Sequence, residues 1–121
     1  EAAVKERLMA IRKAEEQYRK QHGAYTGDWQ TLIRSGLLAD SLQYVPFSGK
    51  RRFSLAATTT IGKSGRQIPL MECGATYDAY LQGLDRHTVS SLMEEANEAG
   101  RYPGLKIGDI SEPNGNHGNW E

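Results

Sequence analysis

The segment Gly62-Lys63-Ser64 has the residue types that end a phosphate-binding loop. Such a loop reads G-x4-G-K-[ST], because its backbone N–H groups and its lysine surround a phosphate. The first glycine would fall at position 57, which is Ala57. The motif also needs a helix after it, whereas strand-forming residues flank this segment on both sides. We therefore interpret residues 62–65 as the turn of a β-hairpin.

The three histidines and the single cysteine are the next candidates for chemistry. His22, His87 and His117 do not pair with one another or with Cys73 at a ligand spacing such as i, i+4. Cys73 cannot form an internal disulfide, and its apolar run (68–73) predicts a buried, inert thiol. No G-x-S-x-G or comparable nucleophile motif is present. We expect no catalytic residue and no cofactor, and infer that the chain is not an enzyme.

Oxygen-bearing side chains gather in the C-terminal tail, and calcium is the metal that such ligands would bind. They are Asp109, Ser111, Glu112, Asn114, Asn116 and Glu121. Their spacing does not match the loop D-x-[DN]-x-[DN]-G-x5-E. The alternative is a turn-rich loop held by asparagine side chains, which we favour, so we expect no metal. Trp120 is then a candidate anchor for the end of the chain.

Composition limits the class of protein. The chain has 121 residues, of which 38% are hydrophobic and 25% charged. These values predict one folded domain with a modest core. Lys and Arg together number 15, as do Asp and Glu, so the formal net charge is zero. A nucleic-acid-binding protein normally carries a basic excess, so we expect no nucleic-acid partner.

A long amphipathic helix is predicted from Ala2 to Gln21, which contains no proline or glycine. Apolar residues recur at spacings of three and four and form one stripe: Val4, Leu8, Ile11, Ala14 and Tyr18. The remaining positions, including Arg12 and Glu15, are mostly charged and are assigned to the solvent side. Gly23 ends the helix. No capping residue or initiator Met precedes it, so we expect an apolar anchor of about 20 residues upstream.

The elements after this helix are shorter. Asp28 can cap a helix from Trp29 to Ser35, and a connector over 40–51 holds an extended segment and a turn at 48–50. Two strands, 52–61 and 66–73, form the hairpin; Gly74 ends the second, and Pro69 indicates an edge or a bulge. A helical turn over 76–81, a helix over 86–99 capped by Asp85, and a strand around 105–107 complete the chain.

Six aromatic residues could line a ligand site or fill the core. They are Tyr18, Tyr25, Trp29, Tyr44, Tyr77 and Tyr80. Aromatic side chains more often fill seams between helices and sheets, with their polar tips at the surface. We favour the core, so no small-molecule substrate is identified.

The segment 14–32 resembles the soluble part of type IV pilins and type II secretion pseudopilins. The residues that carry this resemblance are Ala14, Tyr18, Gly23, Tyr25, Trp29 and Leu32. Thr26 stands where pseudopilins usually have proline. The whole chain, with its tail at 102–108 and its ending Gly118-Asn119-Trp120-Glu121, is similar to membrane-anchored pilin-like proteins of Bacteroidetes. In this family an apolar half-helix lies in the membrane or the filament core, and some pseudopilins bind calcium in a C-terminal loop.

The resemblance implies an α+β fold in which the N-terminal helix packs on a small antiparallel sheet, with two shorter helices beside it. It implies a structural subunit or accessory protein, anchored in the inner membrane with a periplasmic or extracellular domain. Its partners would be copies of itself or related subunits. The alternative is a single-pass anchored domain that binds a ligand or a protein and does not polymerise.

Overall fold

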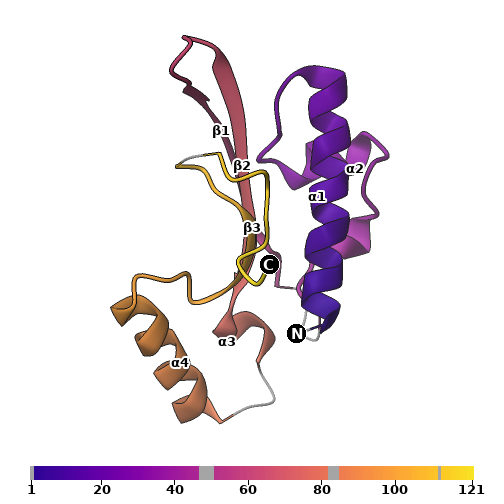
Figure 1. Cartoon of the computed structure of the whole chain (residues 1–121). Coiled ribbons are helices and arrows are strands. Elements are labelled where there is room, and N and C mark those ends of the chain that lie inside the picture. The colour runs from indigo at the N-terminus through magenta and orange to yellow at the C-terminus, as the bar shows by residue number, and fades with distance from the viewer. Residues whose placement is uncertain (1, 47–50, 82–84, 112) are drawn as a thin grey trace.

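In the computed structural model, one long helix lies against a three-stranded sheet, which confirms the predicted α+β fold (Figure 1). The structure describes residues 2–46, 51–81, 85–111 and 113–121. The predicted turn at 48–50, Phe47 in the extended segment, and Glu112 in the tail lie outside the described residues.

The helix α1 (Ala2–His22) ends and the helix α2 (Trp29–Arg34) begins at the residues that the sequence predicts. Gly23 follows α1 with a φ of 83°, a left-handed conformation that costs glycine little. The Asp28 side chain accepts a hydrogen bond from the N–H of Thr31, so it caps α2. The connector holds a 3-10 helix, η1 (Asp40–Gln43), and an isolated bridge between Tyr44 and Arg52.

The sheet has the order β1-β2-β3 and is antiparallel throughout. It consists of β1 (Ser54–Ile61), β2 (Gln67–Thr76) and β3 (Gly104–Gly108). β2 is central, but β3 pairs only with its second half, from Glu72 to Thr76. Pro69 lies in the first half, where β1 is the paired neighbour, so its missing N–H is tolerated.

The prediction that Gly74 ends the second strand is wrong. Gly74 pairs with Ser54 on one side and with Lys106 on the other, in the middle of the sheet. A Cβ atom at this position would lie 2.8 Å from the Leu105 carbonyl oxygen and 2.9 Å from the Tyr102 hydroxyl. Glycine therefore permits a close approach here, and it does not break the strand.

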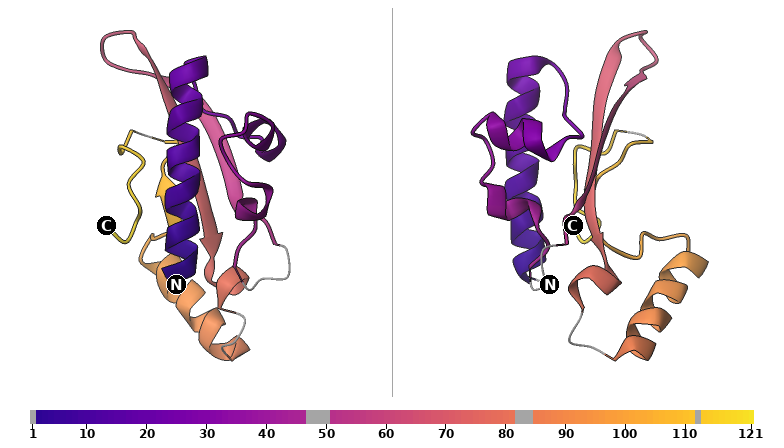
Figure 2. Two further views of the ribbon diagram at one scale, coloured as in Figure 1. Left: turned by 90° about the vertical axis from the view of Figure 1, so that its right-hand side faces the viewer. Right: turned by 180° about the vertical axis from the view of Figure 1, so that it is seen from behind.

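The remaining helices lie at one end of the sheet (Figure 2). They are α3 (Tyr77–Tyr80) and α4 (Arg86–Glu98), which contact each other. Asp85 occupies the N-cap position of α4, as predicted, but its side chain makes no capping hydrogen bond among the described residues. The side of α4 that holds Ala96 faces inward, with Val89, Leu92 and Met93 half-buried.

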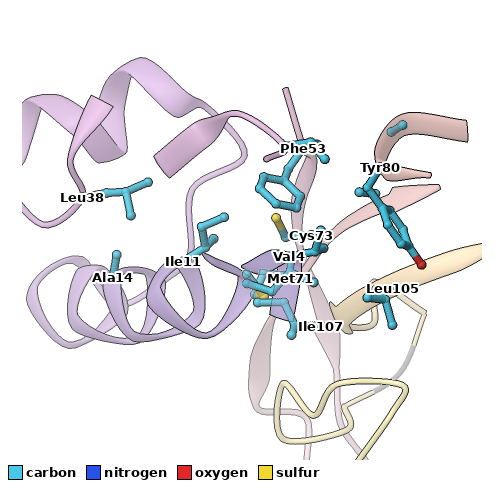
Figure 3. Close-up of a cluster of buried hydrophobic side chains, with 14 of the residues drawn as sticks. Val4, Ile11, Ala14, Leu38, Phe53, Met71, Cys73, Tyr80, Leu105 and Ile107 are labelled. Carbon is cyan, nitrogen blue, oxygen red and sulfur yellow. The ribbon is translucent and has the colours of Figure 1, made fainter. Parts of the chain in front are cut away.

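The core lies between α1 and one face of the sheet. Figure 3 shows side chains of α1 and of the strands converging in this cluster. The sheet contributes Met71, Cys73 and Ile107, each 0% exposed. Burial also raises the pKa of the Cys73 thiol well above its ordinary value, so the cysteine is an inert core residue.

The C-terminal tail runs along the outer edge of β3. Gly118 forms a bridge with Ile107, and the N–H of Asn119 donates to the Lys106 carbonyl. Trp120 packs half-buried against the core, with the Lys5 ammonium 5.8 Å from its ring centroid. The tail thus ends as an ordered part of the domain, as its Asn- and Gly-rich sequence with a terminal aromatic anchor predicts.

Candidate functional site

The packing face of α1 is the first candidate site. Its apolar stripe is buried inside the domain, where Val4, Leu8, Ile11 and Ala14 are at most 3% exposed. Tyr18 packs on the edge of the same cluster, and its ring stacks on His22 with centroids 4.2 Å apart. A neighbouring molecule cannot reach side chains buried in this way. The stripe therefore holds α1 on its own sheet, and contacts with partners must use other surfaces.

The residues around Gly23 tie the end of α1 to three other segments. Leu32 of α2 is buried against the core. The Trp29 indole N–H donates to the Phe53 carbonyl at 3.2 Å, which joins α2 to the start of the hairpin. The Tyr25 hydroxyl accepts a hydrogen bond from the Asn116 side chain at 2.9 Å, which joins the loop to the tail. Each side chain of the 14–32 motif thus has a packing role, and Gly23 supplies the left-handed residue after α1.

Glu15 is a charged residue of α1 whose side chain is buried, contrary to the interpretation of the sequence. It was assigned to the solvent side, but it is 0% exposed. Its Oε1 accepts a hydrogen bond from the Thr26 N–H at 3.0 Å, whereas Oε2 has no partner in the described part of the chain. The Glu15 pKa rises from 4.5 to about 7, because desolvation by burial outweighs the opposing effect of the Thr26 hydrogen bond.

The burial of Glu15 has a signal in the sequence. Position 15 lies four residues after Ile11 and three before Tyr18, so it belongs to the stripe by spacing. Its charge led to the opposite assignment, because carboxylates are rarely fully buried. A glutamate inside an apolar helical stripe is thus the pattern that could have identified it.

Arg12 was also placed on the solvent side, and this too needs correction. Its guanidinium donates to the Asn116 carbonyl at 3.2 Å and to Glu121 Oε1 at 3.1 Å. The same Glu121 oxygen accepts from the Gly118 N–H, and this bond, aided by Arg12, lowers the Glu121 pKa. Arg12 therefore fastens the tail to α1. Only the fold brings these groups together, since they are about a hundred residues apart in the chain.

Four of the described oxygen-bearing side chains of the tail, those of Asp109, Asn114, Asn116 and Glu121, form hydrogen bonds within the chain. Asp109 Oδ1 accepts from the Ser111 N–H, and Asn114 Oδ1 accepts from the Asn116 N–H. Asn116 itself has a φ of 58°, which asparagine tolerates in turns. Within the described residues, no group of three or more His, Cys, Asp or Glu side chains is placed to hold a metal ion.

The aromatic residues mostly contribute to the core. Tyr80 is in the buried cluster, and Tyr18, Tyr25, Trp29 and Tyr77 pack against it. Tyr44 is half-buried, with the Arg52 guanidinium 5.9 Å from its ring centroid.

A shallow hollow of about 400 Å³ lies beside β3. Its lining includes Tyr77, Arg101, Tyr102, Leu105 and Trp120. The hollow thus combines aromatic rings with a cationic side chain.

No protein-family model matches this chain, and no curated protein or solved structure shows significant similarity to it. In the part that the structure describes, no helix has both the length and the apolar character of a membrane span. Functional inference therefore depends on the geometry of the chain itself.

Proposed function

We propose that this chain is the domain of a non-enzymatic structural subunit or accessory protein, similar to a pilin or pseudopilin. An apolar helical segment ahead of α1 would anchor it in the inner membrane, with the domain on the periplasmic or extracellular side. Its partners would be further copies or related subunits. Zero net charge argues against a nucleic-acid partner.

The observation that carries the proposal is the way in which α1 is held. Its apolar stripe is buried on the sheet, while its N-terminal end lies at the edge of the molecule (Figure 1). A helical segment ahead of Ala2 would leave the domain there and continue the axis of α1. The tail is bound to the middle of α1 through Arg12 and to the loop after its far end through Tyr25. Such a helix is suited to carry a rigid domain on an anchor.

The anchor is tested with the protein expressed from its complete gene. We expect the protein to sediment with membranes and to resist alkaline extraction, because an apolar segment of about 20 residues spans the bilayer. Protease added to spheroplasts should digest the domain, which distinguishes a periplasmic domain from a cytoplasmic one. A protein that appears entirely in the soluble fraction, from a gene without an upstream apolar segment, would refute the proposal.

The hollow beside β3 favours a second function, that of an anchored domain that binds a small ligand and does not polymerise. Trp120 lies in its lining, so its fluorescence would report an occupant. We would expect compounds that bind there to lose affinity in Tyr102→Ala and Arg101→Ala. Unchanged fluorescence across a library of small anions and sugars would argue against this function.

A further inference from the structure

The tip of the β1–β2 hairpin carries positive charge in a chain of zero net charge. Residues 51–71 contain four basic side chains and no acidic one, but Arg51 and Arg52 precede β1, and Arg51 pairs with Asp78. Two of the basic residues, Lys63 and Arg66, lie exposed at the tip, next to Ile61, which is 73% exposed. Neither of these two cations has an ion pair within the described part of the chain. The tip therefore presents unpaired positive charge around an apolar side chain.

The exposed side of α4 carries the opposite charge. Glu94, Glu95 and Glu98 are exposed, and Glu98 follows the other two by four and three residues, so the three share one side of the helix. Within the described residues, none of the three forms an ion pair. The opposite side of α4, which holds Ala96, faces the domain. The three carboxylates are thus held outward on a regular element.

These two surfaces lie at opposite ends of the molecule. The hairpin projects beyond the end of the sheet, and α4 lies past the other end (Figures 1 and 2). The tip cannot reach α4 of its own chain. Because both surfaces belong to the same chain, a second copy offers each of them a partner of opposite charge.

We propose that the basic hairpin tip of one copy docks on the acidic side of α4 of another copy. This contact is head-to-tail, so it leaves one free tip and one free α4 and can be repeated along a row of subunits. Ile61 would supply apolar area inside a charged rim, which is the usual arrangement of an interface. The inference rests on the proposed function, because it names the surfaces by which the structural subunits meet.

The contact should be weak between free domains. Ion pairs at a surface are individually weak and are screened by salt. Association of the isolated chain should therefore appear at low ionic strength and high protein concentration, and it should disappear in high salt.

Charge reversal tests the pairing directly. One variant reverses the tip, Lys63→Glu with Arg66→Glu, and another reverses the helix, Glu95→Lys with Glu98→Lys. Sedimentation equilibrium at low salt should show self-association of the wild-type chain, weakened about tenfold or more in either variant. A mixture of the two variants should associate again, since each offers what the other now needs. The chain that carries all four reversals should also regain self-association.

A matched control carries the same change of charge elsewhere. Lys13→Glu with Arg34→Glu alters two exposed cations on α1 and α2 and should associate like the wild type. Thermal melts check that each variant is folded. If the tip variant with two glutamates does not fold, Lys63→Ser with Arg66→Ser takes its place.

Several results would overturn the proposal. The first is a wild-type chain that stays monomeric at every concentration. The second is a tip variant that associates like the wild type. The third is a tip variant that loses self-association while the α4 variant keeps it. In that last case the tip docks on another surface. The full-length protein separates this failure from failure of the proposed function. If chemical cross-linking in membranes still gives multimers of the four-charge and single-surface variants alike, the subunit function stands and only the docking surfaces are wrong.

Discussion

Glu15 makes the stability of the domain depend on pH in a direction opposite to that of most carboxylates. Its Oε1 receives the Thr26 N–H, Oε2 is buried without a partner among the described residues, and its pKa rises from 4.5 to about 7. The folded state therefore retains the proton at a pH where the unfolded chain has lost it. Its contribution to stability is complete below pH 4.5 and is lost as pH rises toward 7. A pKa difference of this size corresponds to roughly 3 kcal/mol.

The substitution Glu15→Gln isolates this effect. Glutamine has the same shape, its oxygen accepts the Thr26 N–H, and it does not titrate. We expect the free energy of unfolding of Glu15→Gln to exceed that of the wild type by about 2–3 kcal/mol at pH 8. The difference should shrink steadily as pH falls to 5. Urea unfolding at half-unit pH intervals, followed by circular dichroism, measures it.

The comparison between the two proteins removes the main confounding groups. All other titratable groups are present in both proteins, so their contributions cancel in the difference. Asp28, Asp78 and Glu121 have pKa values below their ordinary range, so they act at lower pH. Parallel stability profiles for wild type and Glu15→Gln between pH 5 and 8 would refute the argument, because they would mean that Glu15 is ionised in the folded state throughout.

Four further changes test the packing. Leu8→Ala, at a side chain that is 0% exposed, should lower the free energy of unfolding by about 2–5 kcal/mol in urea melts. Gly108→Ala should be severely destabilising and expressed in low yield, because φ is +74° and a Cβ would lie 2.1 Å from the Met71 carbonyl oxygen. Asp28→Ala removes the cap of α2 and should lower the melting temperature, measured by thermal melts. Truncation before Trp120 should lower the melting temperature, because a packed aromatic side chain is lost, while millimolar calcium should leave the melting temperature of the intact chain unchanged. A rise of several degrees with calcium would contradict the metal-free interpretation of the tail.

Local patterns in the sequence predict the helices whose ends are set by nearby residues. The α1 stripe, Gly23 after it and the Asp28 cap are all set by residues within one or two turns of one another. The failures involve distant segments. Gly74 has the composition of a strand end, but Tyr102 and β3 pack on it from about thirty residues away. The composition of a strand does not show which distant segment will pack this closely against it.

The candidate site was less predictable than the fold for the same reason. The stripe follows from its spacing, whereas the Arg12 contacts with the tail join the two ends of the chain. The acidic side of α4 can be read from three glutamates at helical spacing. Its position opposite the basic hairpin tip depends on the path of the sheet between them, which no local pattern contains.

The bridge between Ile107 and Gly118 has a consequence for how this domain behaves when it is crowded. A free strand edge offers its backbone to any other strand, and proteins with long exposed edges aggregate. Here residues 117–119 occupy the outer edge of β3, and where β3 no longer pairs, β2 carries Pro69, which has no N–H to share. The tail therefore blocks the addition of a strand to β3, and Pro69 interrupts the exposed backbone of β2. Copies that are held close together cannot extend the sheet through β3, so contacts at this edge depend on their side chains.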